Sequence, residues 1–419
     1  MARIQGDVSG DRPAIITMRR KDRRRDRARD KIEILRRHLR RERSFVPAHE
    51  LVTDRVVAEA DLVRDVDLFD APLVAAHLSA EEICALRSEP DVARVEVDEG
   101  FRIQVDGSLP ARIAQLPRHE TVPPGVSAVG APEVWSRTTG RGVRAAVLDT
   151  GIDRFHPNIA PNFGGGVSFV PGEPSSDDLN GHGTHCAGIL AGARCGRGIV
   201  GVAPDTTIYA VKVSDHSGVG GWRHLIAGLS WCLYHNIQVV NLSIGDARAP
   251  AAVRSMCATA ARRGLFLVAG AGDDGPKPNS VNYPAAYPSV LAVAAIDSKR
   301  HVAAFSSRGP RIAIAAPGVA ISSCLPDHSA GLLSGTSMAA PHVSGVASLV
   351  VAAFPSTKVL ALADALRQTA RPLGRRPNTA TGWGLASASA AIDFLERAVA
   401  GTSPGRQRKQ PHRRDVCLR

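Results

Sequence analysis

Three polar residues stand in contexts that could support nucleophilic catalysis. Asp149 ends an apolar run in VLDTGID, His182 lies between two glycines in LNGHGTHCAGIL, and Ser337 opens a run of small residues in SGTSMAAPHVSG. A serine hydroxyl needs a base to take its proton. A histidine serves near neutral pH, and a buried carboxylate fixes its tautomer and offsets its charge. Together the three residues predict an acyl-transfer site, with a helix N-terminus at Ser337 to stabilise a negative oxygen.

Each of these residues has a simpler interpretation when it is taken alone. An Asp after a strand is commonly a turn or cap residue, and a Ser before a helix is commonly an N-cap. His182 and His185 are spaced by one helical turn, so they could instead bind a metal ion. The chain has no H-E-x-x-H motif or clustered Cys/His spacing to support that reading, so we expect no metal ligands.

The apolar runs indicate the fold that must position these residues. Continuous apolar strands, separated by helical stretches, are expected at 143–149, 206–213, 237–244, 265–271 and 290–296. This pattern is typical of a parallel sheet covered on both faces. We therefore predict an α/β fold of three layers, α/β/α, with a mostly parallel sheet. Ligand sites in such sheets lie beyond the carboxyl ends of strands, where Asp149 stands.

The composition divides the chain into five segments. They are a basic arm (1–45), a small α+β domain (46–105), a linker with Pro and Gly (106–125), the main domain (126–398) and a basic tail (399–419). In the small domain we expect strands at 68–78 and 92–97. Between them, Ser79-Ala80-Glu81-Glu82 is a capping box that should start a helix ending near Arg87.

The net charge of +12 belongs to the two ends of the chain. Residues 19–43 carry +9 and residues 401–419 carry +5, which leaves −2 for the remainder. We interpret both ends as solvated extensions, with contact to nucleic acid or anionic lipid as the alternative. Within the arm, 31–43 is a candidate helix with few apolar positions.

The chain carries no sequence pattern of a membrane or disulfide-stabilised protein. Its apolar runs fall short of the ~18 residues that a membrane span needs, so a soluble protein is expected. The first 45 residues contain no apolar h-region, so a cytoplasmic protein is the default expectation, with secretion as the alternative if the start is misassigned. Seven cysteines, an odd number, argue against a disulfide framework, and we expect mostly reduced thiols.

At this point the sequence resembles the subtilases, the subtilisin-like serine proteases. VLDTGID, GHGTHCAG and SGTSMAAPHVSG stand where the family has its Asp, His and Ser motifs, in subtilisin's chain order. The resemblance covers about residues 120–395, and residues 68–97 are similar to a subtilase propeptide, a small ferredoxin-like domain. The thiol of Cys186, four residues after His182, resembles the branch that includes thermitase and proteinase K.

The resemblance implies a monomeric serine endopeptidase that hydrolyses polypeptides through an acyl-enzyme and is made as a self-processing zymogen. Asp149 would orient His182, His182 would act as general base and then as general acid, and Ser337 would attack the peptide carbonyl. The propeptide would act as an intramolecular inhibitor, and the processing site would lie in the linker 106–125.

The family binds its substrate as an extra strand between two backbone edges. The segments that match these edges predict the following substrate-binding residues: Gly218, Gly220, Trp222, Ser243, Gly245 and Gly272. Trp222 would wall a pocket for a side chain several residues before the cut. The expected walls of the S1 pocket, 243–246 and 269–272, are small residues and predict an open, apolar pocket. Because Asp215 and Asp246 are acidic, a preference of the S1 pocket for a basic substrate residue stays open as an alternative.

One departure from the family pattern concerns the oxyanion residue. The family's asparagine lies in a Gly-Asn-x-Gly stretch, which here reads Gly272-Asp273-Asp274-Gly275. Asp273 therefore occupies the expected oxyanion position. This keeps open the alternative of a catalytically weak or silent subtilase fold that binds peptides.

A second departure concerns calcium. Many subtilases have an HPDL-like segment, which here reads HPNI with Asn158, and the loop 193–199 carries Arg194 and Arg197. Calcium requires several oxygens and net negative charge, so we predict that the usual site is lost and expect no cofactor. The adjacent acids 177 and 178 are interpreted as solvated surface residues, with ion binding away from the usual site as the alternative.

Overall fold

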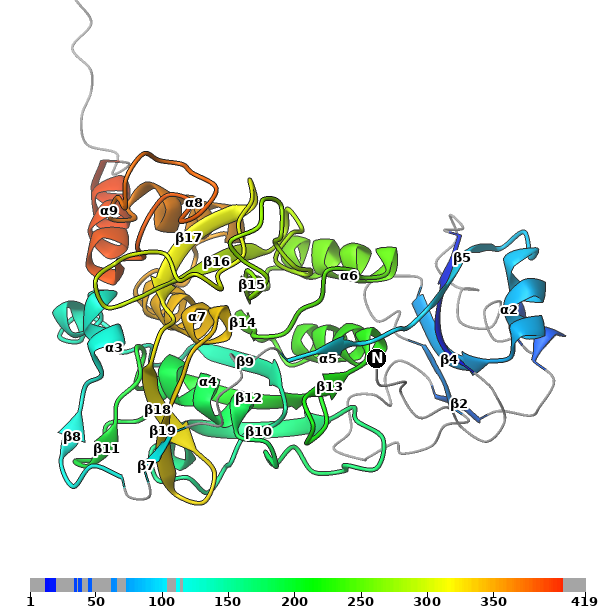
Figure 1. Cartoon of the computed structure of the whole chain (residues 1–419), viewed down its shortest axis with the longest axis horizontal. Helices are drawn as coiled ribbons and strands as arrows, with labels where there is room; N and C mark the ends of the chain where they lie inside the picture. The colour runs from blue at the N-terminus through cyan, green and yellow to red at the C-terminus, as the bar shows by residue number, and fades with distance from the viewer. Residues whose placement is uncertain are drawn as a thin grey trace, which may run out of the picture.

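The computed structural model describes residues 12–19, 34–35, 37–39, 44–46, 62–65, 73–103, 111–113 and 116–401. These residues form a large α/β unit and a smaller N-terminal sheet unit that lies against it (Figure 1). The basic tail beyond residue 401 and most of the basic stretch 19–43 lie outside the described residues.

The large unit is built on one seven-stranded sheet in which all neighbouring strands are parallel. In sheet order the strands are β10 (Phe163–Ser168), β12 (Thr207–Lys212), β9 (Arg144–Asp149), β14 (Val239–Leu242), β15 (Phe266–Gly270), β16 (Leu291–Ile296) and β17 (Ile312–Pro317). The predicted parallel sheet and its five strands are confirmed. The two edge strands, β10 and β17, were not predicted, because β10 contains three consecutive glycines and β17 ends in a proline.

Helices cover both faces of this sheet, as predicted. One face carries α3 (Pro124–Ala128), α4 (His182–Ala191), α7 (Thr336–Ala353), α8 (Val359–Gln368) and α9 (Ala388–Gly401), and the other carries α5 (Trp222–Tyr234) and α6 (Ala251–Arg262). Successive residues of β9 alternate between the two cores. Ala145 and Val147 pack on the α4/α7 side, while Ala146 and Leu148 pack on the α5/α6 side. Both faces are buried, which is why the strand is continuously apolar.

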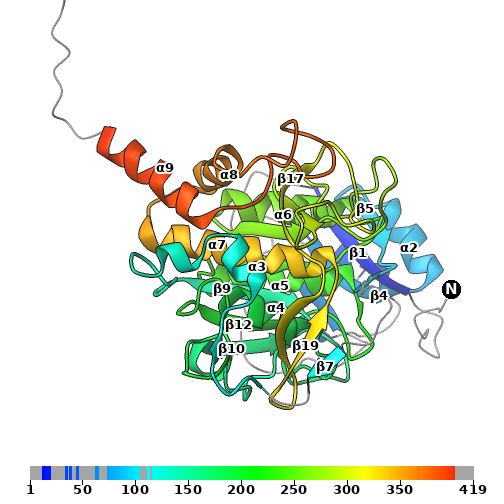
Figure 2. The same cartoon turned by 60° about the vertical axis from the view of Figure 1, so that its left-hand side comes forward.

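Helix α7 crosses the middle of the large unit (Figure 2). It is long and apolar enough to cross a membrane, but 89% of its most apolar window is buried inside the protein. A core helix passes the same test of length and composition, and α7 packs against α4, β14, β15 and β16. It therefore belongs to the core, where it holds its first residues at a fixed place above the sheet.

Short elements complete the large unit. They are the 3-10 turns η2 (Pro132–Val134) and η3 (Ala160–Asn162), the antiparallel pair β18 (Ile321–Leu325) and β19 (Ser329–Leu333), and the two-residue strands β11 (Gly198–Ile199) and β13 (Val219–Gly220). The predicted linker 106–125 is not a free connection where it is described. Its strand β7 (Ala111–Ile113) pairs with β19, and its strand β8 (Glu120–Thr121) pairs with β11.

The N-terminal unit is a sheet in the order β2-β3-β4-β1-β5. Its strands are β1 (Arg12–Met18), β2 (Ser44–Val46), β3 (Leu62–Asp65), β4 (Leu73–Leu78) and β5 (Val92–Val97), and β6 (Phe101–Arg102) follows outside the sheet. The capping box at Ser79 starts α2 (Ala80–Arg87) as predicted. This arrangement is the α+β unit that we expected, and its ferredoxin-like character stays a prediction.

The interpretation of residues 1–45 as a solvated arm is wrong where the structure describes them. β1 lies inside the sheet and pairs antiparallel with both β4 and β5. Ile34 and Leu35 are buried in the core of the N-terminal unit. The small domain therefore begins near residue 12 rather than at residue 46.

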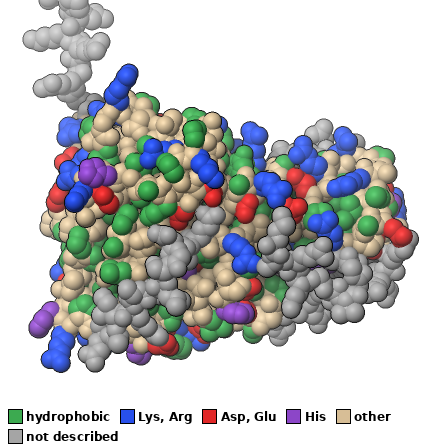
Figure 3. Space-filling model, viewed as in Figure 1, with side chains coloured by type: hydrophobic (Ala, Val, Ile, Leu, Met, Phe, Trp, Pro, Cys, Tyr) green, Lys and Arg blue, Asp and Glu red, His purple; other side chains and the backbone are tan. Residues whose placement is uncertain are grey.

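The surface charges agree with the uneven charge of the sequence. On the face shown in Figure 3, the Lys and Arg side chains are interspersed with Asp and Glu. Positive and negative side chains are thus mixed on this face of the described part. This agrees with the net charge of −2 that remains for the chain between its two basic ends.

Candidate active site

Asp149 and His182 meet at the carboxyl end of the central strand. Asp149 is the last residue of β9 and His182 is the first residue of α4. Their side chains are 0% and 2% exposed, and His182 Nδ1 lies 2.7 Å from Asp149 Oδ1. Burial lowers the pKa of His182, but the charge of Asp149 outweighs it and holds this pKa well above its usual range. The carboxylate therefore orients the ring and stabilises an imidazolium, as a general base requires.

Glycines allow α4 to begin close to the end of β9. Gly181, the N-cap of α4, has φ of +106°, a left-handed conformation that suits glycine. A Cβ atom at Gly183 would collide with the carbonyl oxygen of Gly151. Both features explain why the motif surrounds His182 with glycines.

Asp178 holds this junction together, and its interpretation as a solvated surface acid is wrong. Its carboxylate is 5% exposed and accepts hydrogen bonds from the backbone N–H groups of Gly181 (2.8 Å) and Thr184 (2.9 Å) and from the Thr150 hydroxyl (2.9 Å). It therefore caps α4 and ties the helix to the residue after Asp149. Its position shortly before a helix start was the signal in the sequence that could have revealed it.

Ser337 lies in the first turn of α7, and α7 packs directly on α4. Its backbone carbonyl accepts from the Ser243 hydroxyl (2.7 Å) and the Cys186 thiol (3.4 Å), which fixes the backbone of Ser337. Its own hydroxyl donates to the carbonyl oxygen of Ser243 (3.2 Å), and His182 Nε2 is buried without a hydrogen-bond partner. His182 Nε2 is therefore available to accept a proton, and catalytic hydrogen bonds often form only when substrate binds.

The polar groups around His182 bear on the alternative of a metal site. In the described part of the chain, Asp149, His182 and Cys186 are the only group of potential ligands close enough to share an ion, and they are the triad pair and its neighbouring thiol. His185 points elsewhere, because its Nε2 lies 3.0 Å from the carbonyl oxygen of Ile321. Burial lowers the pKa of His185 to about 3, so it stays neutral. The alternative of a His182/His185 metal pair is therefore not favoured.

Asp273 lies beside the start of the nucleophile helix. Its Oδ1 accepts from the backbone N–H of Thr336 (2.9 Å), the residue before Ser337, and a Cβ atom at Gly335 would come within 3.0 Å of its Oδ2. Burial raises the pKa of Asp273 to about 6, although the hydrogen bond from Thr336 opposes this shift. The carboxyl group can thus be neutral at mildly acidic pH and ionised above neutrality.

A segment of the N-terminal unit occupies the predicted substrate groove. Strand β6 pairs antiparallel with β13, with Phe101 opposite Gly220 and Arg102 opposite Val219. On its other side, Arg102 forms a bridge with Gly245. The chain therefore lies between the two backbone edges as an extra strand.

Gly218 and Trp222 also contact this segment. The backbone N–H of Ile103 donates to the carbonyl oxygen of Gly218 (2.9 Å), and the rings of Phe101 and Trp222 have centroids 4.9 Å apart. A Cβ atom at Gly220 would collide with the Phe101 ring. Gly220 and Trp222 thus form a pocket that holds an aromatic side chain.

The remaining predicted substrate residues lie nearer the nucleophile. Ser243 is buried and bonded to Ser337, and Gly272 has φ of +101° and donates its N–H to the Thr336 hydroxyl (3.0 Å). The carboxylates of Asp215 and Asp246 both accept from nearby backbone N–H groups, at Ser217 and Arg248 respectively. Both acids therefore stabilise turns, which weakens the possibility that they select a basic substrate residue.

The loop 193–199, where we predict that the usual calcium site is lost, is bridged by the side-chain amide of Asn158. The buried side chain of Asn158 donates its Nδ2 hydrogens to the carbonyl oxygens of Ala193 (3.2 Å) and Arg197 (2.9 Å). Carbonyl oxygens are calcium ligands, but an amide nitrogen is not. Arg194, a charged side chain of the loop, forms an ion pair with Glu120 (3.0 Å). The residues present do not fit calcium here.

Two acids of the N-terminal unit cap helices of the large unit, and sequence reasoning missed both. Glu96 accepts from the N–H groups of the first two residues of α6 (2.8 and 3.2 Å), and Asp98 accepts from the first two of α5 (2.9 and 3.0 Å). The N-cap residues of the two helices, Gly221 and Pro250, make no side-chain cap hydrogen bond, and within α5 only His224 accepts from the N–H of Gly221 (3.3 Å). Because these pairs are more than a hundred residues apart in the chain, no local pattern could reveal them.

Comparison with known proteins agrees with this architecture. The model of the subtilase family matches residues 140–384. M-protease of Shouchella clausii (strain KSM-K16) is 38% identical over 342 residues, covering 81% of this chain and 84% of that protein. Subtilisin E of Bacillus subtilis (strain 168) is 38% identical over 304 residues, covering 72% of this chain and 76% of that protein. The thermostable alkaline protease of Halalkalibacterium halodurans is 37% identical over 317 residues, covering 75% and 82%. The chain therefore belongs to the subtilase family of serine endopeptidases.

Proposed function

We propose that this peptidase hydrolyses polypeptides through Asp149, His182 and Ser337 and is made as a self-processing zymogen. The buried 2.7 Å contact between His182 and Asp149 supports the assignment of base and orienting acid. The proposal for Ser337 is supported by its position at the N-terminus of α7, packed on α4. The thiol of Cys186 beside His182 is the feature that favours the thermitase and proteinase K branch.

The zymogen proposal is carried by the strand β6 in the substrate groove. Phe101 and Arg102 pair with the two groove edges and Phe101 fills the pocket at Trp222, so the N-terminal unit would inhibit by occupying the site. The chain downstream of Ile103 leads from the groove to β7, which is paired with β19. We therefore propose that the processing site lies within residues 104–110, a range that overlaps the start of the predicted linker 106–125. A preference for an aromatic residue at the Phe101 position follows.

Mass spectrometry of the purified protein tests this proposal. The wild-type chain should lose its N-terminal part at a single position within 104–110, and Ser337→Ala should remain intact. Processing of the Ser337→Ala chain at the same position, in the absence of any other protease, would show that Ser337 is not the nucleophile.

The alternative function is a weak or silent fold that binds peptides, and Asp273 at the oxyanion position is the observation that favours it. An ionised carboxylate has no proton to donate to an oxyanion. Labelling with a serine-reactive fluorophosphonate distinguishes the two, because only an activated Ser337 reacts.

We also propose that the loop at Asn158 binds no calcium. The amide already satisfies the carbonyl oxygens of Ala193 and Arg197, and the loop carries two arginines in place of acidic ligands. The alternative that the basic ends contact nucleic acid or anionic lipid stays a proposal, since the tail beyond residue 401 and most of the stretch 19–43 lie outside the described residues.

A further inference from the structure

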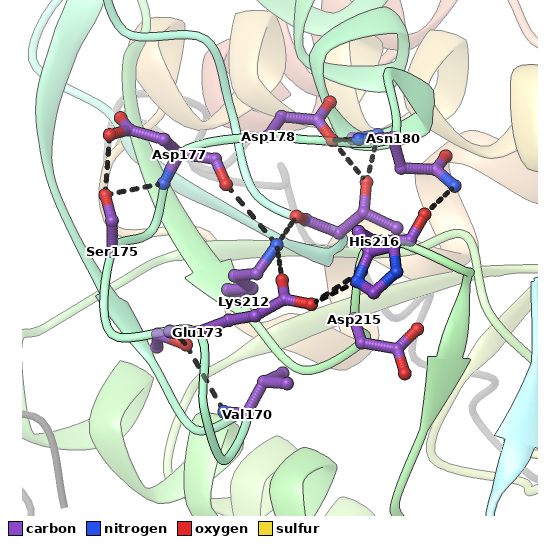
Figure 4. A network of polar contacts seen from close by, with 12 residues as sticks. Val170, Glu173, Ser175, Asp177, Asp178, Asn180, Lys212, Asp215 and His216 are labelled. Carbon is purple, nitrogen blue, oxygen red and sulfur yellow. Dashed lines mark hydrogen bonds and ion pairs between the residues drawn. The ribbon is translucent and has the colours of Figure 1, made fainter. Parts of the chain in front are cut away.

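A polar network beside the triad contains a lysine with no exposed surface (Figure 4). Lys212 is the last residue of β12, and its register partner in the neighbouring strand is Asp149. An ammonium group is costly to bury unless it is paired and hydrogen-bonded. The hydrogen-bond and ion-pair partners of Lys212 therefore indicate its structural role.

Lys212 joins two backbone segments that lead to the triad. Its Nζ donates to the carbonyl oxygen of Thr150, the residue after Asp149, and to that of Asp177 (3.3 Å). Asp177 immediately precedes Asp178, the carboxylate that caps the helix of His182. The ammonium thus holds the end of β9 and the loop before α4 at a fixed separation.

Glu173 extends the network to the substrate groove. One of its oxygens forms an ion pair with Lys212 (3.0 Å), and the other accepts from the backbone N–H of His216 (3.0 Å) and contacts its Nδ1 (2.7 Å). Burial raises the pKa of Glu173, but the hydrogen bonds from His216 and Lys212 outweigh it and lower this pKa, so the group stays ionised.

His216 connects this carboxylate to the loop that forms one groove edge. It lies two residues before Gly218, whose carbonyl oxygen accepts from Ile103 in the groove. The side-chain amide of Asn180, two residues before His182, donates to the carbonyl oxygen of His216 (2.9 Å). Figure 4 shows Glu173 and Asn180 of one segment lying beside Lys212 and His216 of another.

We propose that Lys212 and Glu173 are positioning residues for peptide hydrolysis. The ion pair fixes the backbone after Asp149, the loop that leads to His182 and the groove edge at Gly218 relative to one another. The inference rests on the triad and groove assigned under the proposed function. Both residues act through the backbone and touch neither substrate nor reacting atoms.

The substitution Lys212→Met removes the ammonium and keeps a similar side-chain length. It should lower kcat by about ten- to a hundredfold, because displacing a catalytic group by a fraction of an ångström to 1 Å has effects of this order. It should also raise KM for a peptide that reaches the Phe101 pocket. His216→Ala loosens only the groove edge, so it should raise this KM severalfold and leave kcat nearly unchanged.

Two matched controls remove cations elsewhere. Arg144 lies at the opposite end of β9, where its guanidinium donates to the Tyr209 hydroxyl (2.7 Å), so Arg144→Met tests the loss of a half-buried cation from the same strand pair. His301 pairs with Asp297 (3.6 Å) in a remote turn, so His301→Ala is the control for His216→Ala. Both controls should change kcat and KM by less than about twofold.

Each variant precursor is first cleaved by a trace of affinity-tagged wild-type protease, which is then removed through its tag. The kinetics are measured on the mature enzymes that result. Two peptides are compared, one with four residues before the scissile bond and one with two, and melting temperatures are recorded in parallel. The inference is overturned if Lys212→Met affects kcat no more than Arg144→Met does. If Lys212→Met does not fold, Glu173→Gln decides, because unchanged kcat and KM in that variant would equally refute the role.

The same experiment separates this inference from the proposed function. A wild-type enzyme that cleaves neither peptide, or a Ser337→Ala variant that cleaves as fast as wild type, refutes the triad and the inference with it. An active, Ser337-dependent wild type with unaffected Lys212 and Glu173 variants refutes the inference alone.

Discussion

Replacing Asp273 by Asn should raise kcat at and above neutral pH, by a factor that grows with pH. A neutral amide or a protonated carboxyl group can donate a hydrogen bond to the oxyanion, whereas an ionised carboxylate cannot. Burial raises the pKa of Asp273 to about 6, so roughly one tenth of the wild-type enzyme carries the proton at pH 7 and one hundredth at pH 8. Loss of one oxyanion donor costs about 10²–10³ in kcat.

These values set the expected size of the effect. The Asp273→Asn enzyme should match wild type near pH 5, exceed it about tenfold at pH 7 and approach a hundredfold at pH 8. KM should change little, because the interaction forms only in the transition state. The charge of an ionised Asp273 also favours the imidazolium form of His182, so its removal should move the acid limb of the profile to lower pH.

The assay is a pH–rate profile of both enzymes on one peptide from pH 5 to 9. Asp274→Asn is the matched control: it removes a neighbouring charge that raises the pKa of Asp273, so it should not increase the rate. An Asp273→Asn enzyme that is no faster at any pH would show that Asp273 already donates or is not the oxyanion residue. A rate advantage that is constant with pH would refute the reasoning from ionisation.

Three further outcomes are expected. Ser337→Ala should abolish casein hydrolysis and self-processing on gels, and undiminished hydrolysis would reject the mechanism. A fragment of residues 1–104, added in trans, should inhibit the mature enzyme at micromolar concentration or below. Its Asp98→Asn form should inhibit about tenfold more weakly, because hydrogen bonds to a charged group contribute about 1.5–3 kcal/mol, and equal potency would argue against the helix-cap contact. EDTA should lower the melting temperature of the enzyme only slightly, whereas a loss of ten degrees or more would reveal a strong metal site elsewhere.

The strand that carries Asp149 could be predicted because burial on both faces leaves a simple pattern. The central parallel strand β9 is apolar at every position from Ala145 to Leu148, and Asp149, the candidate orienting acid, follows where this run ends. Likewise, the positions of His182 and Ser337 at helix starts follow from glycines and small residues beside them. In both cases the residues that determine the position of the side chain lie within a short stretch of sequence around it.

Strand β1 is also buried on both faces, but its apolar run was not recognised as a strand. Ala14 and Ile16 pack beneath the N-terminal unit's own helix, while Ile15 packs toward the core of the large unit. Its short apolar run is thus that of a strand covered on both faces, and the strong positive charge of the residues that follow it obscured this pattern. Asp178 was interpreted wrongly because two adjacent acids usually lie in solvent. The helix start four residues later, which Asp178 caps, was not taken into account.

The contacts between the two units suggest that cutting one bond does not free the active site. Glu96 and Asp98 cap helices α6 and α5, and β6 pairs with both groove edges. In each of these contacts the partner from the N-terminal unit lies before residue 104. A cut within 104–110 therefore breaks none of the contacts. The helix ends and groove edges would also lose their hydrogen-bond partners if the N-terminal unit left. It follows that the cleaved fragment should stay bound as an inhibitor, and that its degradation, rather than the first cut, should set the rate at which activity appears.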